Sequence, residues 1–96
     1  MYVVRNVFKC KPGKAGSVIE KFKAAHELMK GDDFEPRVLV DEVAGFWTVV
    51  VEVDVEDMAA FGKVLHERGA RDDVKAAMAG YLDMVESGYR EIFRVA

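Results

Sequence analysis

Two polar side chains of this sequence, His26 and Asn6, lie among apolar residues and could take part in binding or proton transfer. His26 follows Phe22 by four residues, which places it close to the apolar stripe of an amphipathic helix, and an imidazole can act as a base near neutral pH. Asn6 lies in an alternating apolar segment near the N-terminus. The residues that we predict to line a small-ligand site are Asn6, Phe22, His26, Trp47, Met78 and Tyr81.

Each of these residues also has a structural explanation that the sequence leaves open. His26 would serve equally as a boundary histidine that bonds to water or a loop carbonyl, and Asn6 as an amide that satisfies backbone groups of a sheet. Trp47 suits a core or an interface, and methionines at helical spacing usually fill a core. The sequence shows no nucleophile triad, metal-ligand cluster or phosphate-binding loop. We therefore expect neither a metal nor a cofactor.

The hydrophobic period changes along the chain in an order that defines the elements. It predicts strand, helix, strand, strand, helix and strand over residues 2–10, 14–29, 34–43, 46–54, 54–85 and 89–95. Ala44 and Gly45 are the expected hairpin turn. Gly69 is expected to interrupt the second helical region, and Ser87 with Gly88 to end it. The predicted fold is an α+β, ferredoxin-like βαββαβ split sandwich with a four-stranded antiparallel sheet, in a single domain over residues 1–96.

The predicted strands carry apolar residues on both faces, although helices can cover only one. The residues expected under the helices are Val4, Phe8, Trp47, Val49 and Val51, and those on the opposite face are Val3, Val7, Leu39, Phe46 and Val50. The second face would remain in water in a monomer, so we predict a homodimer whose sheets pack face to face. Arg5, Thr48 and Glu52 fit such an interface if they pair across it.

Composition and charge exclude several classes of partner. The net charge of −3 provides no electrostatic footprint for nucleic acid, and Lys9, Lys11 and Lys14 suit a solvated loop. Cys10 is the single cysteine, so no internal disulfide can form, and it suits an apolar filler. The chain lacks a signal-peptide pattern and an apolar run that could span a membrane, and a cytoplasmic location is the expectation.

Four segments of the chain resemble the dimeric α/β-barrel superfamily, which includes antibiotic-biosynthesis-type monooxygenases, haem-degrading monooxygenases and NIPSNAP-like proteins. They are the opening Tyr2–Phe8, the joint Lys11–Lys14, the turn Val53–Met58 and the ending Tyr89–Phe93. The resemblance implies a dimeric barrel. Its haem-degrading branch would require an Asn in the first strand, matched by Asn6, a Trp where Val53 and Asp54 stand, and an iron-ligating His near Met78. Two of these three are missing, so haem degradation is disfavoured.

Two functions remain open. The resemblance implies a cofactor-independent oxygenase for a small aromatic or polyketide-like substrate, in which the substrate supplies the electrons and a dry pocket deprotonates and orients it. The alternative is a non-catalytic dimer that binds a small apolar molecule or serves in assembly. A cavity lined by Asn6 and His26 would favour the enzyme. A filled core in which both side chains have hydrogen-bond partners would favour the non-catalytic module. An RRM-like RNA-binding sheet conflicts with the charge and with Thr48 and Val49, where stacking aromatics are expected.

Overall fold

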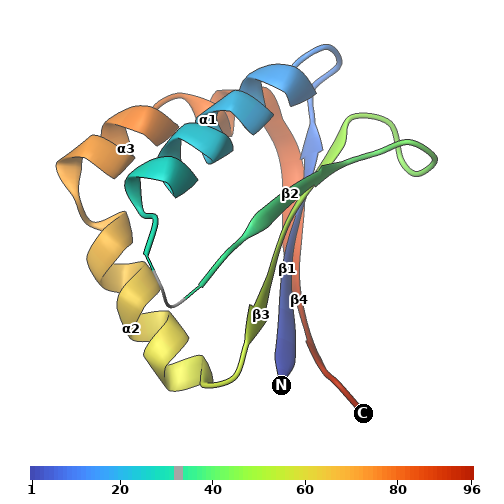
Figure 1. The fold of residues 1–96 in the computed structure, drawn as a ribbon. Coiled ribbons are helices and arrows are strands. Elements are labelled where there is room, and N and C mark those ends of the chain that lie inside the picture. The colour runs from blue at the N-terminus through green and yellow to red at the C-terminus, as the bar shows by residue number, and fades with distance from the viewer. Residues whose placement is uncertain (32–33) are drawn as a thin grey trace.

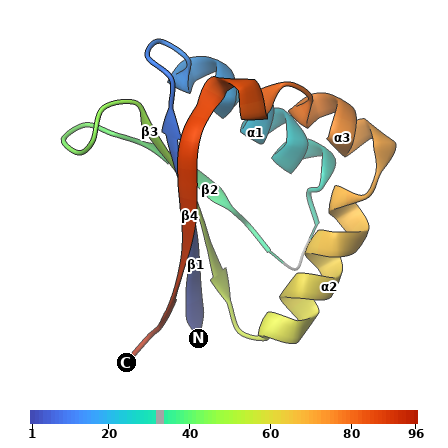
Figure 2. The same cartoon turned by 180° about the vertical axis from the view of Figure 1, so that it is seen from behind.

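The computed structural model describes residues 1–31 and 34–96 and consists of one antiparallel sheet with all its helices on one side (Figures 1 and 2). The elements are β1 (Tyr2–Cys10), α1 (Ala15–Leu28), β2 (Arg37–Val40), β3 (Thr48–Val55), α2 (Met58–Gly69), α3 (Asp72–Met78), the 3-10 turn η1 (Tyr81–Met84) and β4 (Val85–Arg94). The strand order is β2-β3-β1-β4. This arrangement confirms the predicted ferredoxin-like α+β fold.

The main core lies between α1 and the centre of the sheet. Val18 and Phe22 of α1 are buried against Cys10 and Val49, and Ala15 and Ala25 complete the buried stripe of the helix. The spacing of this stripe is the one expected for a helix that packs on a sheet. A second, smaller core beneath the other end of the sheet contains Val4, Val53 and Val55, with Phe34, Met58 and Phe61 packed against it. The α1 prediction is therefore confirmed.

Two arginines fix the end of α1 against the α2–α3 corner. Arg68 Nη1 donates to the Met29 carbonyl at 3.0 Å, and Arg71 Nη1 donates to the Leu28 carbonyl at 3.1 Å. The last carbonyls of a helix have no partner within the helix, and cationic donors suit its negative end. The two side chains therefore tie α1 to a segment about forty residues away, at the start of α3.

The β2–β3 hairpin differs from the prediction in both strand length and turn. β2 covers only Arg37–Val40, because Pro36 lacks the N–H that a ladder requires, and β3 begins at Thr48. The connection therefore covers residues 41–47 instead of a tight turn at Ala44 and Gly45. Trp47 has a φ of 61°, a left-handed conformation that cannot continue a strand. The predicted places of Trp47 and Phe46 on opposite faces of β3 are wrong.

The second helical region is less deeply buried than an amphipathic helix on a sheet would be, and it is more divided than predicted. Gly69 ends α2, as expected for a break there, but no residue of α2 is buried, and Leu65 is exposed. Gly80, with a φ of 85°, then separates α3 from η1. No helix among the described residues is long and apolar enough to cross a membrane.

β4 begins four residues earlier than predicted, so Ser87 and Gly88 lie inside a strand instead of ending a helix. Gly88 pairs with Phe8 of β1, and a Cβ added there would lie 3.0 Å from the Val7 carbonyl oxygen. This glycine therefore allows close approach of two backbones, a use that the sequence alone does not distinguish from a helix end.

The cap of α2 provides a test of local stability. Asp57 Oδ1 accepts hydrogen bonds from the amides of Ala59 and Ala60, at 3.0 and 3.1 Å. Because α2 has no buried residue, we expect Asp57→Ala to lower the stability of the helix by about 1 kcal/mol. Amide hydrogen exchange within α2 measures this change. Asp57→Asn, which keeps a capping oxygen, should retain most of the protection; equal loss in both variants would assign the effect to charge rather than to the cap.

Candidate functional site

The helix-side face of the sheet carries a group of four rings, here called the aromatic cluster: Phe8, Phe22, His26 and Tyr81. Phe22 is central, with ring centroids 4.9 Å from Phe8, 5.8 Å from Tyr81 and 6.5 Å from His26. The rings of Phe22 and His26 are nearly parallel, at 15°. Strand β1, helix α1 and turn η1 each supply at least one member, so the cluster exists only in the folded chain.

His26 is the titratable member of the aromatic cluster. It lies in the last turn of α1, half-buried, and forms no hydrogen bond or ion pair with another described residue. Burial lowers its pKa below the ordinary value of 6.5, because the low-dielectric surroundings disfavour the imidazolium. The neutral ring at pH 7 can therefore accept a proton from a molecule that reaches it.

Asn6 lies on the same face of the sheet but is engaged by a neighbour. Arg90 Nε donates to Asn6 Oδ1 at 2.6 Å, across the β1–β4 register that pairs the two residues. No hydrogen bond joins Asn6 to His26 among the described residues. Arg90 was missed by the sequence analysis, although correct pairing of the first and last strands would have pointed to it.

The remaining predicted site residues divide into two places. Met78 packs against the buried cluster that includes Phe22, so the structure brings Phe22, His26, Met78 and Tyr81 to one region, together with Phe8, which the prediction omitted. Trp47 lies in the hairpin loop, where it lines a separate hollow beside the start of α1. The signal for Phe8 was its position two residues beyond Asn6 on one face of β1.

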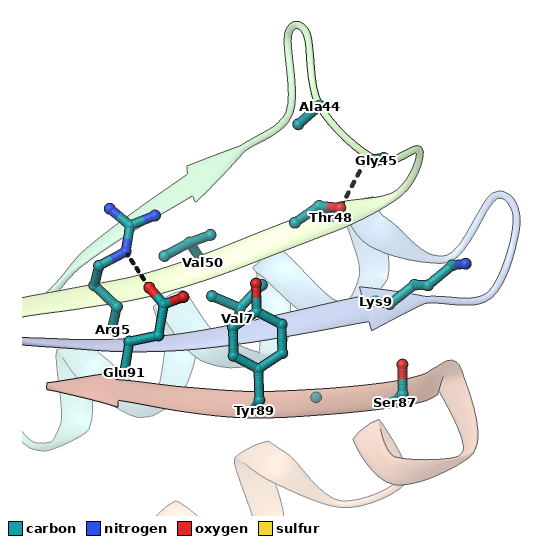
Figure 3. A pocket seen from close by; sticks show the side chains of 11 residues that line it. Arg5, Val7, Lys9, Ala44, Gly45, Thr48, Val50, Ser87, Tyr89 and Glu91 are labelled. Carbon is teal, nitrogen blue, oxygen red and sulfur yellow. Dashed lines mark hydrogen bonds and ion pairs between the residues drawn. The ribbon is translucent and has the colours of Figure 1, made fainter.

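The opposite face of the sheet, here called the open face, has no helix over it (Figures 1 and 2). Register places Leu39, Val50, Val7 and Tyr89 in one row across the four strands, as the face assignment from sequence expected for the first three. Tyr89 is 61% exposed and Phe93 54%. A hollow of about 420 Å³ lies on this face, and the residues around it include Arg5, Val7, Lys9, Thr48, Val50 and Tyr89 (Figure 3).

A row of alternating charges crosses the open face beside the apolar row. Arg37 and Arg5 both hydrogen-bond to Glu52, the latter at 2.8 Å, and Arg5 Nε lies 3.5 Å from Glu91 Oε2. Glu52 is only 5% exposed, so its charge is held almost out of water by the two guanidinium groups. Arg5 and Glu52 would fit a dimer interface if they paired across it, but the structure pairs them within one chain.

The described residues contain no group of three or more side chains that could hold a metal ion. Neither the open-face hollow nor the hollow beside Trp47 is lined by Asn6 or His26. A ligand of His26 would therefore have to bind outside these two hollows, against the rings of the aromatic cluster.

The pKa of His26 can be measured directly. We expect an NMR titration midpoint below 6.5, because burial favours the neutral ring. The unfolded chain then binds this proton more tightly than the folded one, so the stabilising contribution is complete above the ordinary value and is lost as the pH falls through the folded pKa. His26→Gln should remove this part of the pH dependence of unfolding, and His66→Gln should not. A midpoint above the ordinary value would contradict the burial of the ring.

Comparisons with known proteins identify chains with a similar fold but give no information about the site. No family model matches the chain, and no curated protein matches it. A NIPSNAP domain protein from Burkholderia xenovorans superposes with a TM-score of 0.80 at 12% identity, covering 100% of this chain and 95% of that one. A protein from Nitrosomonas europaea, provisionally named an antibiotic biosynthesis monooxygenase, superposes with a TM-score of 0.73 at 14% identity, covering 99% and 98%.

A second NIPSNAP family protein, from Agrobacterium tumefaciens, gives a TM-score of 0.80 at 9% identity, with coverage of 99% and 92%. At these identities the likeness concerns the backbone alone. The resemblance noted from the sequence is thus confirmed as a resemblance of fold: this chain folds like these NIPSNAP proteins and the provisionally named antibiotic biosynthesis monooxygenase.

Proposed function

We propose that the protein is a homodimeric, cofactor-independent monooxygenase-like enzyme that binds a small aromatic molecule against the aromatic cluster and uses His26 as its general base. The observation that carries this proposal is the neutral, half-buried imidazole stacked on Phe22, with no hydrogen-bonding partner among the described residues. A base of this kind matches the chemistry that such oxygenases require.

The reaction requires a substrate whose activated CH₂ group can lose a proton to His26. The resulting enolate or phenolate adds O₂ at carbon and takes back a proton, which gives a hydroperoxide on that carbon. Loss of water then leaves a carbonyl group, so that R₂CH₂ and O₂ become R₂C=O and H₂O. The substrate supplies all the electrons, and the protein supplies the base and the orientation of the substrate.

Asn6 and Arg90 are the polar groups proposed to hold the substrate anion. They lie on the helix-side face of β1 and β4, the face that also carries Phe8 of the aromatic cluster. A guanidinium group would favour the enolate or phenolate over the neutral substrate, because it places a fixed positive charge near the developing oxyanion. The flat rings of Phe22 and Tyr81 would favour a planar aromatic body.

The homodimer is the part of the proposal that rests on the open face. Leu39, Tyr89 and Phe93 are exposed there, and burial of each such side chain would contribute about 1.5–3 kcal/mol. A second copy of the sheet is the cover that matches this surface in size and shape. The dimer would leave the aromatic cluster free, because the cluster lies on the other side of the sheet.

Two specific observations support a second candidate function, the non-catalytic module. Asn6 is engaged by Arg90, and Phe22 is buried within closely spaced rings, as expected for a filled core with a satisfied amide. In that case the protein would be a dimeric module that binds a small apolar ligand without converting it. Its experimental signature would be ligand binding without any consumption of oxygen.

The dimer proposal is tested by comparing single substitutions on the two faces of β4. We expect Tyr89→Asp and Phe93→Asp to give monomers in analytical ultracentrifugation, because each places an uncompensated charge in the proposed apolar interface. Ile92→Asp is the matched control, since Ile92 is 50% exposed on the same strand but faces the helix side. A dimer that survives both open-face variants, or that only Ile92→Asp dissociates, would refute this interface.

The enzyme proposal is tested by oxygen uptake with anthrone-type and phenolic substrates that can form a stabilised carbanion. We expect His26→Ala to lower kcat at least about 100-fold, the usual contribution of a general base. His66→Ala, which removes the other of the two histidines, should leave the rate unchanged. Binding without uptake by the wild-type protein would establish the module instead, and full activity of His26→Ala would exclude this residue as the base.

A further inference from the structure

A second hollow, of about 350 Å³, lies between the first turns of α1 and the loop that joins β2 to β3. Its walls are mainly apolar and include Ile19, Val40, Phe46 and Trp47, with Asp41 as the charged member. It shares no lining residue with the hollow on the open face. The loop that forms its outer wall projects beyond the sheet in both ribbon views (Figures 1 and 2).

The two aromatic rings of this wall are exposed to solvent, and the backbone of one of them, Trp47, is strained. Phe46 is 81% exposed and Trp47 is 42% exposed. Trp47 adopts a φ of 61°, and its carbonyl accepts a hydrogen bond from the Cys10 amide at 2.8 Å, which holds the strained residue in place. A bulky residue in the left-handed region costs about 1–3 kcal/mol and often marks a functional position. Core packing does not require this conformation, since the ring is half in water.

Asp41 supplies a negative charge that the described part of the chain does not neutralise. Its Oδ1 accepts a hydrogen bond from the Thr48 amide at 2.9 Å, and Asp41 forms no ion pair with any residue in ranges 1–31 and 34–96. Burial, followed by the negative field of Asp41, raises the pKa of the neighbouring Cys10 thiol. The charge of Asp41 therefore acts on a buried neighbour as well as on the hollow that it lines.

We propose that this hollow binds a small organic cation, an ammonium group carried on a flat apolar body. The ammonium would pair with Asp41 while the faces of Trp47 and Phe46 attract it through their ring quadrupoles, and the apolar body would lie against Ile19 and Val40. This site is separate from the aromatic cluster that contains His26, and it does not depend on the proposed oxygenase activity.

The opposite wall of the hollow presents a competing charge. Ala15 and Gly16 belong to the first turn of α1, and its N-cap residue, Lys14, makes no side-chain capping bond. The positive end of the helix dipole carries about half a unit charge, less than the full charge of Asp41. The ammonium is therefore expected at the Asp41 side, and preference for an anion is the outcome that would contradict the proposal.

A matched ligand series separates charge from apolar contact. Benzylammonium, benzyl alcohol and phenylacetate share a phenyl ring and differ in charge. Binding is followed by the fluorescence of Trp47, the single tryptophan of the chain, and by NMR shifts of the Ile19 and Val40 amides. We expect benzylammonium to bind at least about tenfold more tightly than benzyl alcohol, with phenylacetate weakest. Equal affinities, preference for phenylacetate, or shifts confined to other residues would overturn the proposal.

Three variants assign the effect to individual residues. Asp41→Asn keeps an oxygen for the Thr48 amide but removes the charge, so it should abolish the preference for benzylammonium, whereas Glu42→Gln, in the same loop but outside the lining, should not. Trp47→Gly suits the left-handed backbone, and we expect unchanged or higher stability with loss of binding by NMR. Unchanged binding in Asp41→Asn or in Trp47→Gly would refute the site as described.

Discussion

Every layer of this protein depends on the hydrogen bonding of β1 along both of its edges. Residues Tyr2–Lys9 pair with β3 and Tyr2–Cys10 pair with β4, so the first strand of the sequence is an inner strand of the sheet. Because its side chains alternate, β1 directs Val4 and Phe8 toward the helices and Arg5 and Val7 toward the open face. A shift of one residue in either ladder would exchange the two surfaces and destroy both.

The same register places the charges of the open face. Glu52 is buried between Arg5 and Arg37, and a buried ion pair of this kind contributes little stability compared with apolar packing. Its value lies in specificity, since two surfaces can meet only where each charge keeps its partners. Arg5 also faces Glu91 on β4, so three strands are tied by one guanidinium group (Figure 3). The proposed dimer would inherit this fixed arrangement.

The helix side offers two chemically different surfaces. The aromatic cluster holds a neutral imidazole against Phe22, which suits proton transfer to or from an aromatic molecule. The hollow beside Trp47 combines exposed rings with the charge of Asp41, which suits binding of a cation without chemistry. The two surfaces share no residue, since the aromatic cluster contains Phe8, Phe22, His26 and Tyr81 and the hollow is lined by others. A substitution in one surface can therefore leave the other intact.

The sequence alone determined the element order, the α1 stripe and the two-faced sheet, because these follow from the hydrophobic periods of neighbouring residues. It placed the start of the second helical region at residue 54, which is wrong: Asp54 and Val55 still belong to β3, and Asp57 is the N-cap of α2. It failed at Trp47, Phe46 and Gly88, where contacts with distant strands set the backbone: the Cys10 amide holds Trp47, and the Val7 carbonyl leaves no room beside Gly88. Only the tertiary structure joined Asn6 to Arg90, and Phe22 with its helix neighbour His26 to the rings of Phe8 and Tyr81. Asn6 and Arg90 lie near opposite ends of the chain, and Phe8, Phe22 and Tyr81 belong to three different elements. Strand register and helix packing, which no local pattern encodes, decide these contacts.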